Sequence, residues 1–281
     1  MNEYVPEKKW SWDEELGGKF GGINRPSAGA RSEKNVPRGK HPFQLYSLAT
    51  PNGVKVTIMF EELLARGIQQ AQYNAHLINI LELDQFCSGF VNINPNSKIP
   101  ALVDTSEDKD IHIFESGAIL LYLADKFKAF IPNDLRGRTE TLNWLFWQMG
   151  SAPYLGGGFG HFYNYAPVKL KYPIDRFTME TKRQLDVLDQ NLNKKNYIAG
   201  DEYTIADMAI WPWYGALVQN KLYDAGEFLD VRIYKNLQRW ADQIRERKAV
   251  RKGRMVNRTW GDEDEQVHER HSDIDFECKA I

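Results

Sequence analysis

The chain has 281 residues, of which 42% are apolar and 26% are charged, and its formal net charge is −2. This length is enough for two domains of ordinary size, and the balanced composition excludes a disordered or fibrous chain. A net charge near zero provides no long-range attraction to nucleic acid or to an anionic membrane, so we expect neither as a partner.

The number of cysteines and the length of the apolar runs exclude further classes of protein. Cys87 and Cys278 are the only cysteines, and they stand far apart without metal-ligand spacing. The sequence therefore predicts neither a disulfide framework nor a zinc site, and the scattered histidines give no reason to expect another metal. No run of about 18 apolar residues and no secretory pattern occurs, so we expect a cytoplasmic protein.

Residues 1–41 are polar, glycine-rich and basic, with Trp10, Trp12 and Phe20 as their few apolar anchors. This pattern favours an extended N-terminal arm over a domain. A disordered tail is the alternative, because segments without periodic apolar residues often do not order.

Residues 42–130 have the pattern of a small α/β domain. Short apolar runs predict four strands, and apolar residues at helical spacing predict two helices. The predicted strands cover residues 43–48, 73–80, 101–104 and 111–114, and the predicted helices cover 54–66 and 116–127. An irregular segment with room for a short helix precedes the third strand, and this order describes a thioredoxin-like domain.

Strand signals stop in the second half, so residues 138–250 are predicted to form an all-helical domain. The predicted helices cover residues 138–150, 172–194, 204–220 and 232–247. Thr204 and Asp207 have the form of a capping box, and Pro212 is expected to kink the helix that follows. Residues 251–281 are charged and have no core pattern, so we expect a tail that packs weakly or frays.

The stretch "TPNG" lies where the first strand passes into the first helix. Such a junction aims free backbone N–H groups and the positive helix end at one point, which favours an anion such as a thiolate. Thr50 adds a hydroxyl and Asn52 an amide, while Pro51 and Gly53 shape the turn. A plain turn without a function is the alternative.

Two further motifs fit an extended, peptide-like ligand. Pro100 in "KIPAL" directly precedes a short strand, where a cis bond would expose the backbone of Ile99 to a ligand; a trans proline at a sheet edge fits equally well. Glu115 and Ser116 begin a helix, where the hydroxyl can donate to a carboxylate and the carboxylate can accept from an ammonium. Together they match the α-amino acid end of a ligand, although a simple helix cap is the alternative.

In this order the three motifs resemble the glutathione transferase superfamily. The segments "GGKFGGINRP", "NWLFWQMG", "GGGFGHFY" and "YTIADMAIWPW" are similar to its bacterial Nu-class members. The resemblance implies a thioredoxin-like α/β domain, an all-α C-terminal domain and an N-terminal extension. It also implies glutathione-dependent reduction of small or mixed disulfides. A general glutathione transferase, an organic hydroperoxide peroxidase and a non-catalytic binding or regulatory protein are the alternatives.

The resemblance also assigns roles to the motif residues. Thr50 and Asn52 would face the sulfur of glutathione as the catalytic pair, and Ile99 would bind the cysteinyl backbone. Glu115 and Ser116 would hold the γ-glutamyl end. The reactive thiols would then belong to the ligand and not to the protein.

Further contacts follow from the same resemblance. Gln85 and Lys98 would be additional polar contacts to glutathione, and Asn24 and Arg176 would bind a second glutathione molecule. The family also implies two glutathione molecules per subunit and a homodimer.

Other residues that could be assigned to thiol chemistry have simpler explanations. Cys87 is expected to be a packed or surface thiol. Tyr46 and Ser47 are secondary candidates for activating a thiol, and strand alternation turns at most one of them toward a ligand. Trp211 and Trp213 are expected in the core or a domain interface, with a substrate wall as the alternative.

Overall fold

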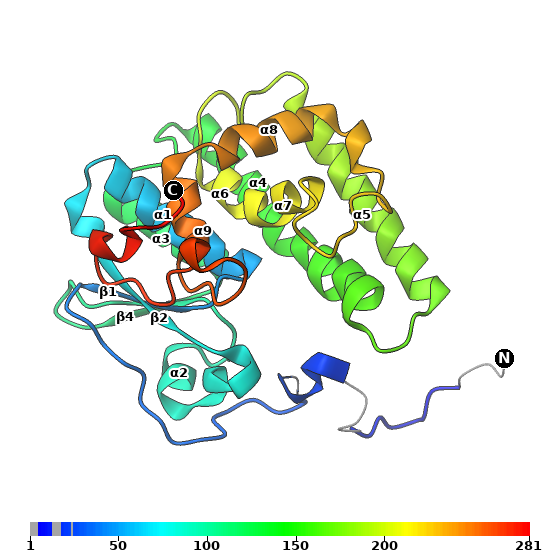
Figure 1. The fold of residues 1–281 in the computed structure, drawn as a ribbon, viewed down its shortest axis with the longest axis horizontal. Helices are drawn as coiled ribbons and strands as arrows, with labels where there is room; N and C mark the ends of the chain where they lie inside the picture. Colours follow the sequence, from blue (N-terminus) through cyan, green and yellow to red (C-terminus); the bar gives the residue numbers. More distant parts are fainter. Residues whose placement is uncertain (1–4, 13–17, 24) are drawn as a thin grey trace.

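The computed structural model describes residues 5–12, 18–23 and 25–281 (Figure 1). Its sheet has the strand order β2-β1-β3-β4, in which β1 pairs in parallel with β2 and antiparallel with β3, and β3 pairs antiparallel with β4. The strands are β1 (Phe43–Ser47), β2 (Tyr73–Leu77), β3 (Ala101–Asp104) and β4 (Ile111–Phe114). All four predicted strands are confirmed, with β2 ending three residues earlier than predicted.

Helices cover both faces of the sheet. The helices α1 (Pro51–Ala65) and α3 (Ser116–Phe127) lie on one face, and the short α2 (Ser88–Ile93) lies on the other (Figure 1). Leu45 joins the main core under α1 and α3, whereas Tyr46 packs with Phe90 in a smaller cluster on the α2 side. Side chains of β1 thus alternate between two buried faces, as expected of a central strand.

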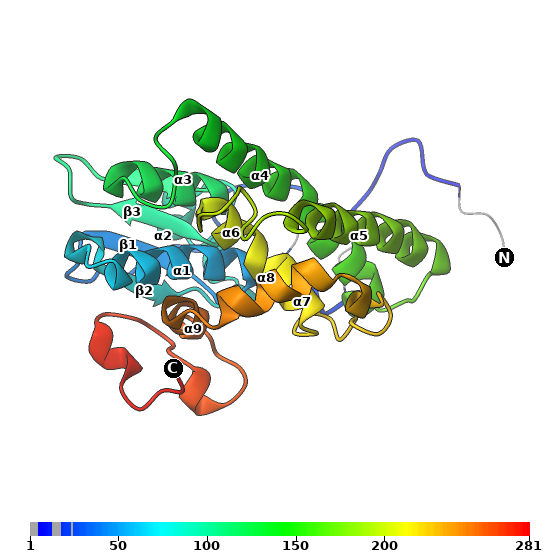
Figure 2. The ribbon, with the colours of Figure 1, turned by 90° about the horizontal axis from the view of Figure 1, so that it is seen from above.

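The second half is helical and lies beside the sheet domain (Figures 1 and 2). It contains α4 (Leu135–Pro153), α5 (Lys171–Leu192), α6 (Ile205–Ile210), α7 (Ala216–Val218), α8 (Lys235–Arg245) and α9 (Lys248–Met255). Two wide π-helical segments, Tyr154–Tyr165 and Trp211–Gly215, continue α4 and join α6 to α7. The second segment begins beside Pro212, whose missing N–H interrupts the regular hydrogen-bond ladder that the sequence predicted over 204–220.

The predicted capping box at the start of α6 is confirmed. The Thr204 hydroxyl accepts from the backbone of Ala206 at 3.3 Å, and the Asp207 carboxylate accepts from the backbone of Thr204 at 2.9 Å. Asp207 also accepts from the backbone of Ile198 and from the indole of Trp240. Complete burial raises the pKa of Asp207 to about 6, although these three donors and the Thr204 hydroxyl, which donates to the carboxylate at 3.3 Å, oppose the shift. The box therefore anchors the centre of the helical domain.

The prediction that the segment from residue 251 packs weakly is wrong. This segment runs beside α9 and β2 (Figure 2), and Arg270 exchanges two backbone hydrogen bonds with Ala75 on β2, of 2.8 and 3.2 Å. The Arg270 guanidinium is fully buried, donates to the carbonyl of Tyr73 at 2.7 Å and lies 3.3 Å from Glu61. The tail thus covers the open edge of the sheet, which would otherwise leave a row of unpaired backbone groups.

Part of the arm is held against the α2 side of the sheet domain. The backbone of Arg31 donates to Phe86 at 2.7 Å, and Ser88 donates to Ser32 at 2.8 Å. The hydroxyl of Tyr46 donates to the carbonyl of Pro37 at 2.8 Å. This stretch of the arm is therefore hydrogen-bonded to the sheet domain.

Candidate functional site

A cavity of about 270 Å³ lies where the starts of α1 and α3 face the helical domain. The sheet domain contributes Asn52, Lys55, Glu115 and Ser116 to its lining. The helical domain contributes Gln148, Met149, Ala152, Pro153, Gly156, Gly157 and Trp213. Three residues predicted from the motifs, Asn52, Glu115 and Ser116, are therefore brought together in one hollow between the two domains.

The "TPNG" turn forms the start of α1 as predicted. Thr50 is the N-cap, with φ −67° and ψ 163°, and its hydroxyl makes no capping hydrogen bond. Pro51 occupies the first turn, where its missing N–H costs nothing. A Cβ on Gly53 would overlap the carbonyl oxygen of Leu48, so only glycine lets the helix start this close to the end of β1. The turn thus leaves the Thr50 hydroxyl without a capping partner and the first-turn N–H groups available to an anion, although Thr50 itself does not line the cavity.

Asn52 is oriented by the helical domain. The indole Nε1 of Trp213 donates to Asn52 Oδ1 at 2.9 Å. Because the oxygen of the amide is engaged, Nδ2 is left as the hydrogen-bond donor at the cavity. Trp213 is therefore a wall of the site that also sets the direction of its amide, whereas Trp211 is buried in the core and donates to the carbonyl of Ala241.

Gly156 makes room for that tryptophan. An added Cβ at Gly156 would lie 2.6 Å from the six-membered ring of Trp213, well inside van der Waals contact. The glycine-rich π-helical segment thereby lets the Trp213 ring approach both the cavity and Asn52.

The start of α3 supplies a second polar group. Glu115 is the exposed N-cap, with φ 70°, a conformation that residues with side chains rarely adopt and that is concentrated at functional sites. The Ser116 hydroxyl is buried and accepts from the Lys55 ammonium at 3.2 Å. Lys55 also donates to Gln148 Oε1 at 2.8 Å. Burial lowers the pKa of Lys55 to about 7, and the charge of Glu115 opposes this shift.

Lys55 and Gln148 were not predicted from the sequence. Lys55 follows Asn52 by three residues, which places both on one face of the helix, and it stands between two buried valines. A lysine in an otherwise apolar run was thus an available signal for a buried charge. Gln148 gave no such signal, because its role depends on how α4 packs against α1.

The remaining predicted contacts do not line this cavity. The Ile99–Pro100 bond is cis, which decides between the two conformations left open by the sequence. Lys98 is exposed, Gln85 is buried and donates to the carbonyl of Ile80 at 3.2 Å, and Arg176 is exposed on α5. Their roles, and that of Ile99, stay predictions. Asn24 lies outside the described residues.

The other residues considered for thiol chemistry lie outside the cavity. Cys87 is buried, is the N-cap of α2 and accepts from the backbone of Phe90 at 3.4 Å, which confirms a packed thiol. Cys278 is an exposed free cysteine in the tail. Neither Tyr46 nor Ser47 lines the cavity. Burial raises the pKa of Tyr46 to about 12, so it is poorly suited to activating a thiol.

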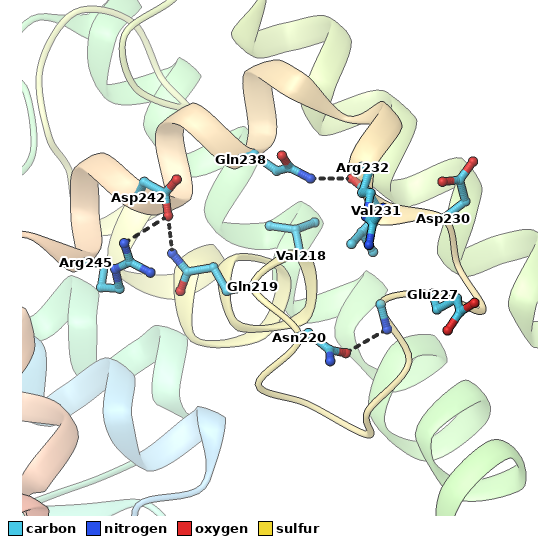
Figure 3. A pocket seen from close by; sticks show the side chains of 11 residues that line it. Val218, Gln219, Asn220, Glu227, Asp230, Val231, Arg232, Gln238, Asp242 and Arg245 are labelled. Carbon is cyan, nitrogen blue, oxygen red and sulfur yellow. Dashed lines mark hydrogen bonds and ion pairs between the residues drawn. The ribbon is translucent and has the colours of Figure 1, made fainter.

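A larger hollow of about 620 Å³ lies in the helical domain, between α8 and the segment that follows α7 (Figure 3). Its side chains largely satisfy one another: Asp242 accepts from Gln219 at 2.9 Å and pairs with Arg245, and Asn220 accepts from the backbone of Gly226. It contains none of the predicted site residues. Among the described residues, no cluster of three or more His, Cys, Asp or Glu side chains is arranged to hold a metal, and no helix is long and apolar enough to cross a bilayer.

Family models match both halves of the chain. The N-terminal domain of glutathione S-transferase matches residues 43–125, and its C-terminal domain matches residues 172–243.

Individual relatives match three quarters or more of the chain. The disulfide-bond oxidoreductase YghU of Escherichia coli is 63% identical over 99% of this chain and 97% of its own length. A crystal structure of glutathione transferase YghU from Streptococcus pneumoniae, complexed with glutathione, matches with a TM-score of 0.87 and 58% identity over 91% of this chain and 99% of that one. A glutathione transferase from Burkholderia graminis, with two glutathione molecules bound per subunit, matches with a TM-score of 0.71 and 42% identity over 76% of this chain and 88% of that one. The chain therefore belongs to the glutathione S-transferase family.

Proposed function

We propose that the protein is a glutathione-dependent disulfide-bond reductase in which both reacting thiols belong to glutathione. The observation that carries this proposal is the donor pair at the start of α1. Thr50 has a hydroxyl that no cap uses, and Asn52 has an amide whose N–H₂ group is left free by Trp213. No cysteine lines the adjoining cavity, so these groups can stabilise a thiolate but cannot replace it.

The reaction proceeds by two exchanges. The thiolate of one glutathione attacks a disulfide, forms a new S–S bond and releases the other half as a thiolate that takes up a proton. A second glutathione thiolate then attacks the mixed disulfide and releases the second thiol. Two glutathione molecules are thereby oxidised to glutathione disulfide, and the substrate disulfide is reduced to two thiols.

The residues at the start of α1 stabilise the negative charge of a bound thiolate. The free N–H groups, the positive helix end and the two side-chain donors favour a thiolate over a thiol, so they lower the pKa of a bound glutathione. An attacking thiol works best when its pKa is near the ambient pH, which calls for moderate lowering only. Two hydrogen-bond donors and a helix end, without a full positive charge at the sulfur, suit that requirement.

The other end of the tripeptide fits the start of α3. Ser116 offers a hydroxyl to a carboxylate and Glu115 offers a carboxylate to an ammonium, which together match the γ-glutamyl group. We also propose two glutathione molecules per subunit, as in the structure of the relative from Burkholderia graminis, with Arg176 on α5 contacting the second.

We further propose a homodimer in the cytoplasm. Large apolar side chains such as Phe146 on α4 and Met179 on α5 are 62% exposed each, which is surface that a second copy would cover. The reducing cytoplasm would keep glutathione and the two unpaired cysteines in the thiol form. Sedimentation velocity measures the oligomeric state directly.

The test is glutathione-driven reduction of hydroxyethyl disulfide by the wild type and by Asn52→Ala. We expect the variant to lose at least about tenfold in rate, because a hydrogen bond to a charged sulfur contributes roughly 1.5 to 3 kcal/mol. An unchanged rate would remove Asn52 from the site. Rates on a chloronitrobenzene and on an organic hydroperoxide, measured in parallel, decide the reaction class: dominant conjugation or peroxidase turnover would replace the proposed reduction.

A further inference from the structure

Lys55 is a buried lysine without an ion-pair partner among the described residues. Its side chain is 1% exposed, and its Nζ donates only to the neutral oxygens Gln148 Oε1 and Ser116 Oγ. A charge in such a place is unfavourable unless something compensates it. The cavity it lines is where compensation can come from, because a bound anion would face it there.

In its charged form, which a bound carboxylate favours, Lys55 fixes how its two neighbours present their hydrogens. A lysine ammonium donates three hydrogen bonds and accepts none, so the oxygens of Ser116 and Gln148 are both held as acceptors. The Ser116 hydroxyl hydrogen and the Gln148 N–H₂ group are then left for another partner. Among the residues that the structure describes, the Ser116 hydroxyl has only the weak acceptor Met149 Sδ, at 4.0 Å, and the buried Gln148 Nε2 has no hydrogen-bond partner.

We propose that Lys55 is a positioning residue that sets Ser116 and Gln148 as two parallel donors to a carboxylate, and that this carboxylate is the α-carboxylate of the γ-glutamyl group. The inference rests on the proposed glutathione site and extends it with two residues. Gln148 contacts the ligand through Nε2, and Lys55 acts through the side chains it orients. Glu115, on the rim of the same cavity, receives the adjoining ammonium.

The arrangement couples ligand binding to protonation of Lys55. The groups that face Lys55 are Glu115 and Ser116 from the start of α3 and Gln148 and Met149 from α4, and Glu115 is the charged one among them. With its pKa lowered to about 7, Lys55 is largely neutral in the free protein at pH 8. A carboxylate bound beside it favours the charged form, so binding at pH 8 takes up a proton.

The experiment is calorimetric titration with a thiol-free analogue, γ-glutamyl-2-aminobutyryl-glycine, at pH 8 in two buffers of different ionisation enthalpy. Without a thiol, the measured proton exchange cannot come from sulfur. The wild type should take up between about half and one proton per ligand. Lys55→Met should take up none and should bind about tenfold more weakly. Gln148→Leu should bind more weakly and still take up a proton.

Lys235→Met is the matched control, because it makes the same chemical change at an exposed site on α8. It should bind as the wild type does. In turnover, Lys55→Met should raise the KM for glutathione about tenfold and leave kcat within about twofold, since the thiolate end is untouched. Thermal unfolding checks that Lys55→Met folds; if it does not, Lys55→Gln replaces it with the same expected loss of proton uptake.

Three results separate the possible failures. Wild-type affinity and wild-type proton uptake in Lys55→Met would overturn this inference and leave the proposed function standing, as would a wild type that binds the analogue without proton uptake. A wild type that does not bind the analogue at all would overturn both.

Discussion

Replacing Trp213 with phenylalanine tests whether the helical domain orients Asn52. The change keeps an aromatic ring against Gly156 and removes the indole N–H that donates to Asn52 Oδ1 at 2.9 Å. A hydrogen bond of this kind contributes about 1 kcal/mol net, which corresponds to roughly a fivefold preference for one amide orientation. We therefore expect the rate of glutathione-driven reduction of hydroxyethyl disulfide to fall by about fivefold or less.

Trp211→Phe is the matched control. Trp211 also donates one indole hydrogen bond of 2.9 Å, to the carbonyl of Ala241, but it lies in the core and does not line the cavity. This variant should lower the free energy of unfolding and leave the rate per folded molecule unchanged.

The decisive experiment is a double-mutant cycle that combines Trp213→Phe with Asn52→Ala. If Trp213 acts through Asn52, then Trp213→Phe should have little further effect in the Asn52→Ala background. Equal effects of Trp213→Phe in the presence and absence of the Asn52 amide would refute the orientation argument, and would assign Trp213 to the cavity wall alone.

Three further predictions concern stability. Gly53→Ala should lower the free energy of unfolding by about 1 to 3 kcal/mol in denaturant titration, because its Cβ overlaps the Leu48 carbonyl and the backbone must move; a loss below about 0.5 kcal/mol would contradict the close approach. Arg270→Met should cost about 3 to 5 kcal/mol, because it leaves the buried Glu61 carboxylate with Lys252, at 4.0 Å, in place of two neighbouring cations, and the loss should be larger at pH 8 than at pH 5, where protonation of Glu61 relieves it. The pKa of Lys55 is about 7 in the folded protein, against an ordinary value of 10.5. Between these two pH values the unfolded chain binds more protons than the folded protein. The free energy of unfolding should therefore rise with pH across that window, by at most about 5 kcal/mol. Lys55→Met should lack this part of the rise, and an identical pH dependence in both proteins would contradict the burial of a lysine ammonium.

The sheet domain was predictable because its signals are local. Apolar runs of strand length, a turn of the form "TPNG" and the helical spacing over 116–127 each depend on neighbouring residues, and each appears where the sequence placed it. The capping box at Thr204 and Asp207 is local in the same sense.

The tail and the π-helical segments were harder because their stability comes from elsewhere in the chain. Arg270 is stabilised by the backbone of β2 and by Glu61, about 200 residues away in sequence, so its own neighbourhood shows only charge. The segment 154–165 is rich in glycine, which argues against a helix, yet those glycines admit the rings of Trp213, Phe177 and Tyr223. Tertiary packing therefore overrides local propensity in both places.

The part of the site that could be predicted also depends on local signals. Asn52, Glu115 and Ser116 stand at the starts of helices, where the sequence alone shows free backbone groups. Lys55, Gln148 and Trp213 complete the cavity through contacts between α1, α3, α4 and the segment after α6, and such contacts leave no local pattern.

The central claim is that the sulfur chemistry belongs to the bound ligand while the polypeptide supplies donors and a favourable field. The most direct measurement is glutathione-driven reduction of hydroxyethyl disulfide by a variant with Cys87→Ala and Cys278→Ser, compared with the wild type after both have been shown to fold and to bind glutathione. We predict a rate within about twofold of the wild type, because neither cysteine lines the cavity. Complete loss of turnover in a folded, glutathione-binding variant would contradict the claim.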